Sequence, residues 1–186
     1  NIYPLTVTDV QKGAATGNYD LNADNYHDAQ GFPALDFLIH GVANNDVNAL
    51  NKFTSNPNKE GYVDYLTKVV AQMNVLNNSY VDDWKNNYRS TFVNSTSNTV
   101  TSSLNKVVND FMYYYEKGLR ANKIGIPAGN FSSTPLPNTI EAFYKKEVSK
   151  ELTLDGLKAV QDFFNGKAYG SSSTGESFKT YLIALD

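Results

Sequence analysis

Apolar residues recur every three or four positions from residue 59 to residue 93, and this is the clearest pattern in the sequence. The period predicts an amphipathic α-helix that directs one face toward a core. No proline interrupts the segment, and Asn58 stands before it as the predicted N-cap. A helix of this length spans roughly 50 Å, which is typical of helical bundles. Its apolar stripe consists of Tyr62, Tyr65, Leu66, Val69, Val70, Met73, Leu76, Tyr80, Trp84, Tyr88 and Phe92.

A second long apolar stripe begins near Thr99, directly after the polar connector formed by residues 94–98. The stripe predicts another long helix with one apolar face. Because the connector between the two predicted helices is short, we expect them to pack as an antiparallel hairpin. The apolar positions of the second helix are Val100, Leu104, Val107, Val108, Phe111, Tyr114, Tyr115 and Leu119.

Shorter helices are predicted on either side of this pair. Residues 31–41 form a compact apolar segment, with Pro33 suited to a first helical turn and Gly41 suited to a helix end. Residues 153–165 predict a third helix, with Thr153 as its N-cap and Gly166 as its stop. Residues 178–186 begin a further helix that ends abruptly. So short a helix is marginal by itself, which suggests that the chain is cut or is completed by a second polypeptide.

The remaining segments read as loops. Residues 1–30 are rich in Asn, Asp and Gly and favour loop structure, with a short helical turn at residues 7–13. Residues 44–58 are expected to be a loop, and residues 125–140 carry three prolines in a Gly- and Ser-rich context. No alternation typical of β-strands continues for more than a few residues. The sequence therefore predicts an all-α, up-and-down helical bundle.

Composition excludes several classes of function. The 186 residues, 41% of them apolar, suffice for one domain with a sizeable core. The net charge of −3 and the scattered Lys and Arg residues give no basic surface for nucleic acid. The absence of cysteine excludes disulfides, thiolate metal sites and cysteine nucleophiles. No apolar run reaches the roughly 18 residues that would span a bilayer.

One pair of residues points to metal chemistry. Asp36 and His40 lie four positions apart on one helical face, so both side chains could reach one ion. His27 is near in sequence, and a mixed His and carboxylate site would suit iron or zinc. The alternative is that Asp36 and His40 bond each other or a helix end. The H-E-x-x-H pattern of zinc proteases is absent.

The densest aromatic run is formed by residues 113–115 and is followed by Glu116. Three successive residues cover about 200° of a helix surface, so these tyrosines cannot all face one core. Some of them, Tyr114 among the candidates, are expected to line a groove or an interface, where a hydroxyl could bind ferric iron or a planar ligand. The alternative is that they lie at the rim of the bundle with their hydroxyls in water.

Three stretches, in this order, resemble the imelysin family of bacterial envelope proteins. The first is G-F-P-A-L-D-F-L-I-H-G at residues 31–41, similar to the family's G-x-H-x-x-E motif with its apolar continuation and closing glycine. The second is E-K-G-L-R-A-N-K-I-G-I-P at residues 116–127, similar to a long helix with a K-I-G-x-P-like end. The third, residues 140–166, resembles the acidic loop and short helix that follow in the family.

The motif departs from the family pattern at two positions. Pro33 occupies the histidine position and offers no side-chain ligand or donor. Asp36 occupies the glutamate position and keeps a carboxylate on a side chain one methylene shorter. His40, one turn further on, is a candidate replacement imidazole, which is an inference from the spacing and not a family feature.

The resemblance implies a fold and a setting. Family members are longer and are read as two related helical bundles around a cleft at the motif. Residues 1–186 would then be one helical domain that is incomplete at both ends and needs missing helices or a second polypeptide. The resemblance also implies an exported or lipid-anchored protein, with any lipid anchor outside this chain. Many members are linked to iron or haem uptake, and peptidase activity is claimed for some.

The leading hypothesis from the sequence is a non-enzymatic envelope binding protein for iron, haem or a peptide. Its predicted binding residues are Gly31, Pro33, Asp36, Tyr114 and Glu116, and its predicted metal ligands are Asp36 and His40. No catalytic residue is assigned. A metal-dependent peptidase with iron or zinc is the second hypothesis, and a helical protein-interaction module is the third.

Overall fold

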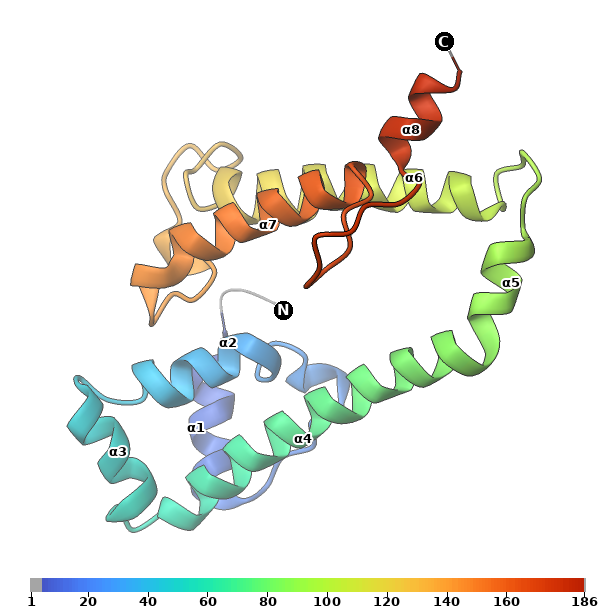
Figure 1. Cartoon of the computed structure of the whole chain (residues 1–186). Helices are drawn as coiled ribbons and strands as arrows, with labels where there is room; N and C mark the ends of the chain where they lie inside the picture. The colour runs from blue at the N-terminus through green and yellow to red at the C-terminus, as the bar shows by residue number, and fades with distance from the viewer. Residues whose placement is uncertain (1–4, 186) are drawn as a thin grey trace.

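The computed structural model describes residues 5–185 and is built from helices in two layers (Figure 1). Within these residues the only extended pairing is an isolated bridge between Lys167 and Thr174, so the all-α prediction is confirmed. None of the helices in this range is long and apolar enough to cross a membrane. The α-helices are α1 (Val7–Thr16), α2 (Gly31–Asp36), α3 (Asp46–Thr54), α4 (Lys59–Asp83), α5 (Arg89–Asn94), α6 (Ser103–Tyr113), α7 (Ser149–Phe164) and α8 (Phe178–Ile183).

Short helical turns of other types link or extend these helices. Three segments are π-helical and continue α2, α4 and α6: Phe37–Gly41, Trp84–Tyr88 and Tyr114–Gly125. Three are 3-10 turns: Asp24–Tyr26, Pro137–Thr139 and Lys146–Val148. We call α1 to α4 the N-terminal layer, and we call α6 to α8 with the loops between them the C-terminal layer. The α5 helix and its π turn connect the two layers along one side (Figure 1).

The long helix predicted at residues 59–93 is confirmed as α4, a π turn and α5 in one continuous course. Asn58 precedes it as predicted, but its side chain makes no capping hydrogen bond. Its backbone has φ −99° and ψ 20°, outside the extended conformation that directs a capping side chain onto the helix end. The carbonyl of Asn58 instead accepts from the N–H of Tyr62.

Two regions predicted as loops contain helices. Residues 46–54 form α3, where the side chain of Asn45 accepts a hydrogen bond from the N–H of Asn48 at 2.9 Å and so caps the helix. Asn45 is the N-cap of this helix and Asp46 lies in its first turn, so residues that are typical of loops here begin a helix. The short turn expected at residues 7–13 extends to Thr16, and Gly17 ends it with φ +69°.

The start predicted for the third helix is wrong. The helix, α7, begins at Ser149, and the hydroxyl of Thr153 donates to the carbonyl of Ser149 from within the helix. The predicted stop is confirmed, because Gly166 has φ +67°, a conformation that favours glycine. The final helix is confirmed as α8, and Ser177 and Thr180 form a reciprocal capping box at its start.

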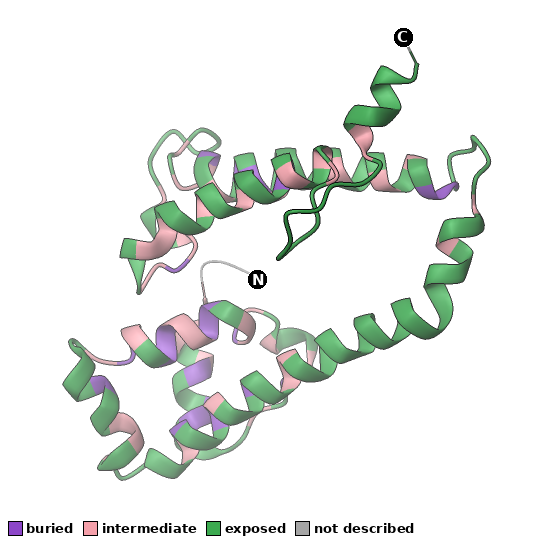
Figure 2. Ribbon diagram, in the orientation of Figure 1, coloured by how far each residue is buried: buried purple, intermediate pink, exposed green. Residues whose placement is uncertain are grey.

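The core lies in the N-terminal layer (Figure 2). Tyr65 is fully buried there, and its hydroxyl donates to the carbonyl of Ala29 at 2.9 Å. Its ring packs on Tyr19 with 4.4 Å between the ring centroids. Most residues of the C-terminal layer are exposed or half-buried, so this layer contributes little to the core. The buried core residues are Val10, Ala14, Leu21, Ala29, Ala34, Phe37, Leu38, Val42, Ala49, Tyr62, Tyr65 and Val69.

The approach of α1 to α4 depends on one glycine. A Cβ atom added at Gly61 would overlap the carbonyl oxygen of Ala14 in α1. Any side chain at position 61 must therefore push the two helices apart, and interior packing tolerates such shifts poorly.

We expect Gly61→Ala to lower the free energy of unfolding by about 2 kcal/mol, since overpacking outweighs the better helix propensity of alanine. Gly175→Ala is the matched control, because a Cβ atom there would meet nothing within 4 Å. Urea denaturation of both variants checks this. Equal stability of Gly61→Ala and the unmodified protein would show that the helices separate without cost.

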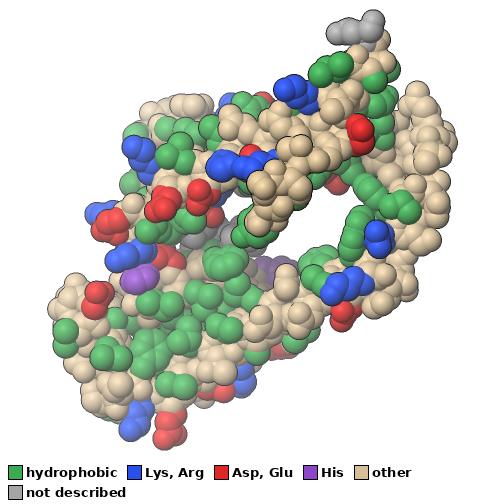
Figure 3. Space-filling view, in the orientation of Figure 1, with side chains coloured by type: hydrophobic (Ala, Val, Ile, Leu, Met, Phe, Trp, Pro, Cys, Tyr) green, Lys and Arg blue, Asp and Glu red, His purple; other side chains and the backbone are tan. Residues whose placement is uncertain are grey.

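The two long helices run in opposite directions but do not pack against each other, so the predicted hairpin packing is wrong. Figure 1 shows α4 and α6 in different layers, and Figure 3 shows an opening through the molecule between them. The apolar face of α4 is already used in its first half, where Tyr62, Tyr65 and Val69 are buried in the N-terminal layer. Phe111 of α6 instead stacks on Phe163 of α7.

A carboxylate in α2 joins the two layers. Asp36 accepts hydrogen bonds from two successive backbone N–H groups of the C-terminal layer, Tyr144 at 2.8 Å and Lys145 at 2.9 Å. The ring of Tyr144 packs edge-on against Phe37, with 5.2 Å between the ring centroids, and lies where a side chain at Gly41 would be. We call the two hydrogen bonds accepted by Asp36 the Asp36 clamp.

We expect Asp36→Ala to lower the free energy of unfolding by about 2–3 kcal/mol, because two N–H groups lose a charged acceptor. Asp36→Asn keeps one acceptor oxygen and should lose less. Hydrogen exchange at the amides of residues 144 and 145 should accelerate in both variants. Asp82→Ala, a change at an exposed carboxylate of α4, is the control. Unchanged exchange at the two amides in Asp36→Ala would contradict a clamping role.

Candidate functional site

The motif segment forms α2 and the π turn that follows it. Gly31 begins the helix with φ +73°, a conformation that other residues rarely adopt. Pro33 lies in the first turn, as predicted, where its missing N–H leaves no helix hydrogen bond unmade. Its ring is fully buried, so position 33 contributes to the core.

Asp36 is half-buried and faces the loop at residues 140–148 rather than open solvent. Each carboxylate oxygen accepts one hydrogen bond from a backbone N–H, so both oxygens take part in the Asp36 clamp. Burial, and then the nearby Asp36 charge, raise the pKa of the Tyr144 phenol. An ion pair holds the loop in place: it joins Glu141 to Lys123 of the π-helical segment Tyr114–Gly125.

His40 lies at the end of the motif segment, beside a shallow groove shared with Asp46, Leu50 and Phe53. Within residues 5–185, no group of three or more His, Asp or Glu side chains is close enough to hold a metal ion. The pair Asp36 and His40 stays a prediction as a metal site. A metal ion there would have to compete for the carboxylate of Asp36 with the backbone N–H groups that donate hydrogen bonds to it.

Tyr114 and Glu116 belong to the C-terminal layer, in the π segment that continues α6. Tyr114 lines an apolar groove together with Phe111 and Phe163. Glu116 is exposed and pairs with Arg120 at 2.6 Å, one helical turn away. The structure therefore groups Gly31, Pro33 and Asp36 in α2 and places the other two predicted residues in a different layer.

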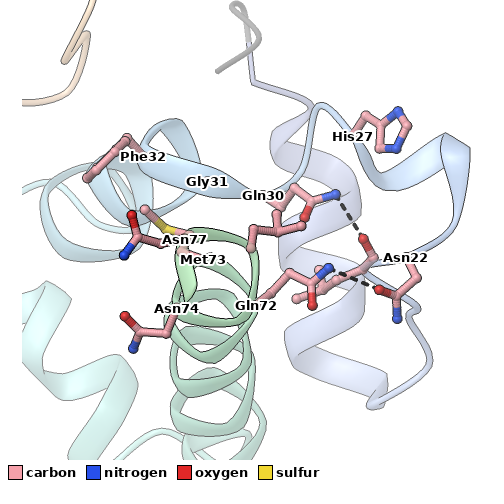
Figure 4. A pocket seen from close by; sticks show the side chains of 11 residues that line it. Asn22, His27, Gln30, Gly31, Phe32, Gln72, Met73, Asn74 and Asn77 are labelled. Carbon is pink, nitrogen blue, oxygen red and sulfur yellow. Dashed lines mark hydrogen bonds between the residues drawn. The ribbon is translucent and has the colours of Figure 1, made fainter. Parts of the chain in front are cut away.

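A larger groove opens beside the start of α2, with a volume of about 750 Å³, which is in the range of small-molecule sites (Figure 4). The loop before α2 forms one wall and the middle of α4 forms the other. We call it the amide groove, because five of its side chains are Asn or Gln. Its lining residues are Leu21, Asn22, His27, Gln30, Gly31, Phe32, Gln72, Met73, Asn74, Leu76 and Asn77.

Two hydrogen bonds hold the amide groove in shape (Figure 4). The amide of Gln30 donates to the carbonyl of Leu21 at 2.9 Å within the loop wall. The amide of Gln72 donates to the side-chain oxygen of Asn22 at 3.0 Å and so ties α4 to the loop. The two walls are therefore connected before any ligand enters.

The groove offers three kinds of contact to a ligand. Leu21, Met73 and Leu76 supply apolar surface, and the amides supply both hydrogen-bond donors and acceptors. His27 adds an imidazole whose side chain is 58% exposed. No Lys, Arg, Asp or Glu residue is among the lining residues. The groove therefore suits a ligand that is largely apolar with a few polar groups.

Sequence reasoning found Gly31 of this groove and noted His27, but it missed the contribution of α4. The residues involved, Gln72, Asn74 and Asn77, lie in a stretch of α4, residues 69–81, that carries no charged residue. This cluster of amides was the available signal. Only the fold shows that the amides lie opposite the loop before α2.

Comparison with family models identifies the family of the chain. The model of the family described as Imelysin matches residues 1–186, the entire chain. No curated protein and no solved structure matches the sequence or the fold. The family match agrees with the three ordered stretches, the first of which forms α2 and its π turn. The chain therefore belongs to the imelysin family.

Proposed function

We propose that this chain is a non-enzymatic binding protein of the bacterial cell envelope, linked to iron or haem uptake, with the amide groove as its binding site. The observation that carries the proposal is the position of Asp36. Both oxygens of its carboxylate accept backbone N–H groups of the C-terminal layer, so the motif stabilises the fold. The amide groove beside the motif remains open to a ligand.

Haem is the ligand that best fits the groove chemistry. Its macrocycle is flat and apolar, and Leu21, Met73 and Leu76 offer apolar contact. The imidazole of His27 and the thioether of Met73 are side chains of the types that ligate haem iron. Amide N–H groups such as those of Asn74 and Asn77 are suitable donors to the haem propionates.

A metal-dependent peptidase is the weaker alternative. Such an enzyme needs a ligand set for its metal and a general base near the substrate. Pro33 has no side-chain ligand, and the carboxylate of Asp36 is engaged by two hydrogen bonds. The location in the envelope is part of the proposal and is supported by membership of the family.

We expect the purified protein to bind haem saturably, with a shift of the Soret band. His27→Ala should weaken binding by about tenfold or more, because an iron ligand worth over about 1.4 kcal/mol is lost. His40→Ala is the matched control, since His40 lies outside the amide groove. An absorption titration compares the three proteins. Absence of a saturable spectral change, or equal weakening by both substitutions, would overturn the haem proposal.

The enzymatic alternative is tested on the same preparation. The proposal predicts no release of fragments from unfolded protein substrates after incubation with zinc or ferric iron. Cleavage that is abolished by a chelator and by Asp36→Asn would instead favour the peptidase.

A further inference from the structure

The C-terminal layer carries an apolar groove that the proposed function does not use. It lies between α6 and α7, has a volume of about 340 Å³, and is lined mainly by Val107, Phe111, Tyr114, Val160 and Phe163. The rings of Phe111 and Phe163 stack with 5.8 Å between their centroids, and both residues line the groove. We call it the aromatic groove. Asp110 is the one charged residue that lines it.

The α8 helix begins at this groove and then leaves it. Phe178, the first residue of α8, packs edge-on against Phe111 with 5.3 Å between the ring centroids. The rest of the helix projects away from both layers (Figure 1). Its apolar residues Leu182 and Ile183 are 53% and 64% exposed, and Leu185 just beyond it is also exposed. A short apolar helix in this position lacks the packing that normally stabilises helices of its length.

The charges of the two features are complementary. Lys179 is the one charged residue of α8, and it is exposed. Asp110 is exposed at the aromatic groove. Within residues 5–185 neither side chain forms an ion pair. If α8 entered the aromatic groove, Leu182 and Ile183 would contact the apolar residues that line it. Lys179 would then lie near Asp110.

The exposed area of the chain is large enough for a stable dimer. A compact folded protein of 20.6 kDa exposes about 8,900 Å², whereas this chain exposes 12,488 Å². The surplus exceeds the roughly 1,000–2,500 Å² that each partner buries in an obligate homodimer. Exposed apolar residues of α6, α7 and α8 contribute to this surplus, together with those of α4 and α5.

We infer that the aromatic groove is a docking site for α8 of a second copy of this chain. The contact is reciprocal, because the α8 helix of each copy enters the groove of the other, as two-fold symmetry requires. Since α8 begins beside its own groove, the symmetry axis passes near Phe178 of both copies. In the dimer Leu182 and Ile183 become buried and Lys179 faces Asp110 of the second copy.

Sedimentation velocity over a series of protein concentrations tests the inference. The expected result is a dimer with a dissociation constant of about 1 µM or tighter. The double substitution Leu182→Glu with Ile183→Glu should weaken the dimer at least about 100-fold, because it places charges in an apolar contact. Both residues are exposed in the single chain, so the fold, checked by circular dichroism, should persist.

A control substitution outside the contact, and an exchange of the charges of Asp110 and Lys179, test whether α8 and the aromatic groove form the interface. Val100→Glu changes an exposed apolar residue outside the groove and α8, and should leave the dimer intact. Asp110→Lys and Lys179→Asp should each weaken the dimer about tenfold or more, and the two together should restore it.

Three results would overturn the inference. One is a monomer at all concentrations, which would leave another polypeptide or a further segment as the occupant of the groove. Another is a dimer that withstands the double substitution in α8. The third is a charge exchange that fails to restore the dimer weakened by the single changes.

Discussion

The fold depends on one carboxylate that lies between two layers. Asp36 ends α2 in the layer that holds the core, and it accepts two backbone N–H groups from the loop that precedes α7. The chain also connects the layers covalently through α4 and α5, and an opening remains between α4 and α6 (Figure 3). A charged acceptor is the stronger kind of hydrogen-bond partner, and a pair of such bonds fixes orientation as well as distance. The carboxylate of Asp36 therefore stabilises the contact between the two layers.

The two layers differ in how they are stabilised. The N-terminal layer buries a continuous apolar cluster, including the fully buried Tyr65 and Val69 of α4. The C-terminal layer relies on ring contacts such as that between Phe111 and Phe163 and leaves much apolar surface exposed. Hydrophobic stabilisation scales with the area removed from water, so the second layer gains less from its own packing. Contact with the N-terminal layer, with a ligand or with another chain would remove more of its apolar surface from water and so stabilise it further.

Much of the fold could be predicted from the sequence, because the period of apolar residues reports directly on helices. The course from α4 to α5, the stop at Gly166 and the start of α8 all follow from local patterns. The α3 helix could not be recognised, because the Asn and Asp residues that cap helices also mark loops. The motif position of Asp36 and its spacing from His40 both mark it as a candidate site residue. Its partners lie more than 100 residues away, and no local pattern encodes a contact at that separation.

The hydrogen-bond partners of Asp36 are main-chain N–H groups, and this determines which substitutions leave the contact intact. A backbone N–H is present in every residue except proline, so the side chain at position 145 can vary without loss of its hydrogen bond. Position 36 has no such freedom, because the contact requires an acceptor with two oxygens at that distance from the helix. Evolution can therefore reshape the surface of the loop around Lys145 while the geometry between the layers is kept.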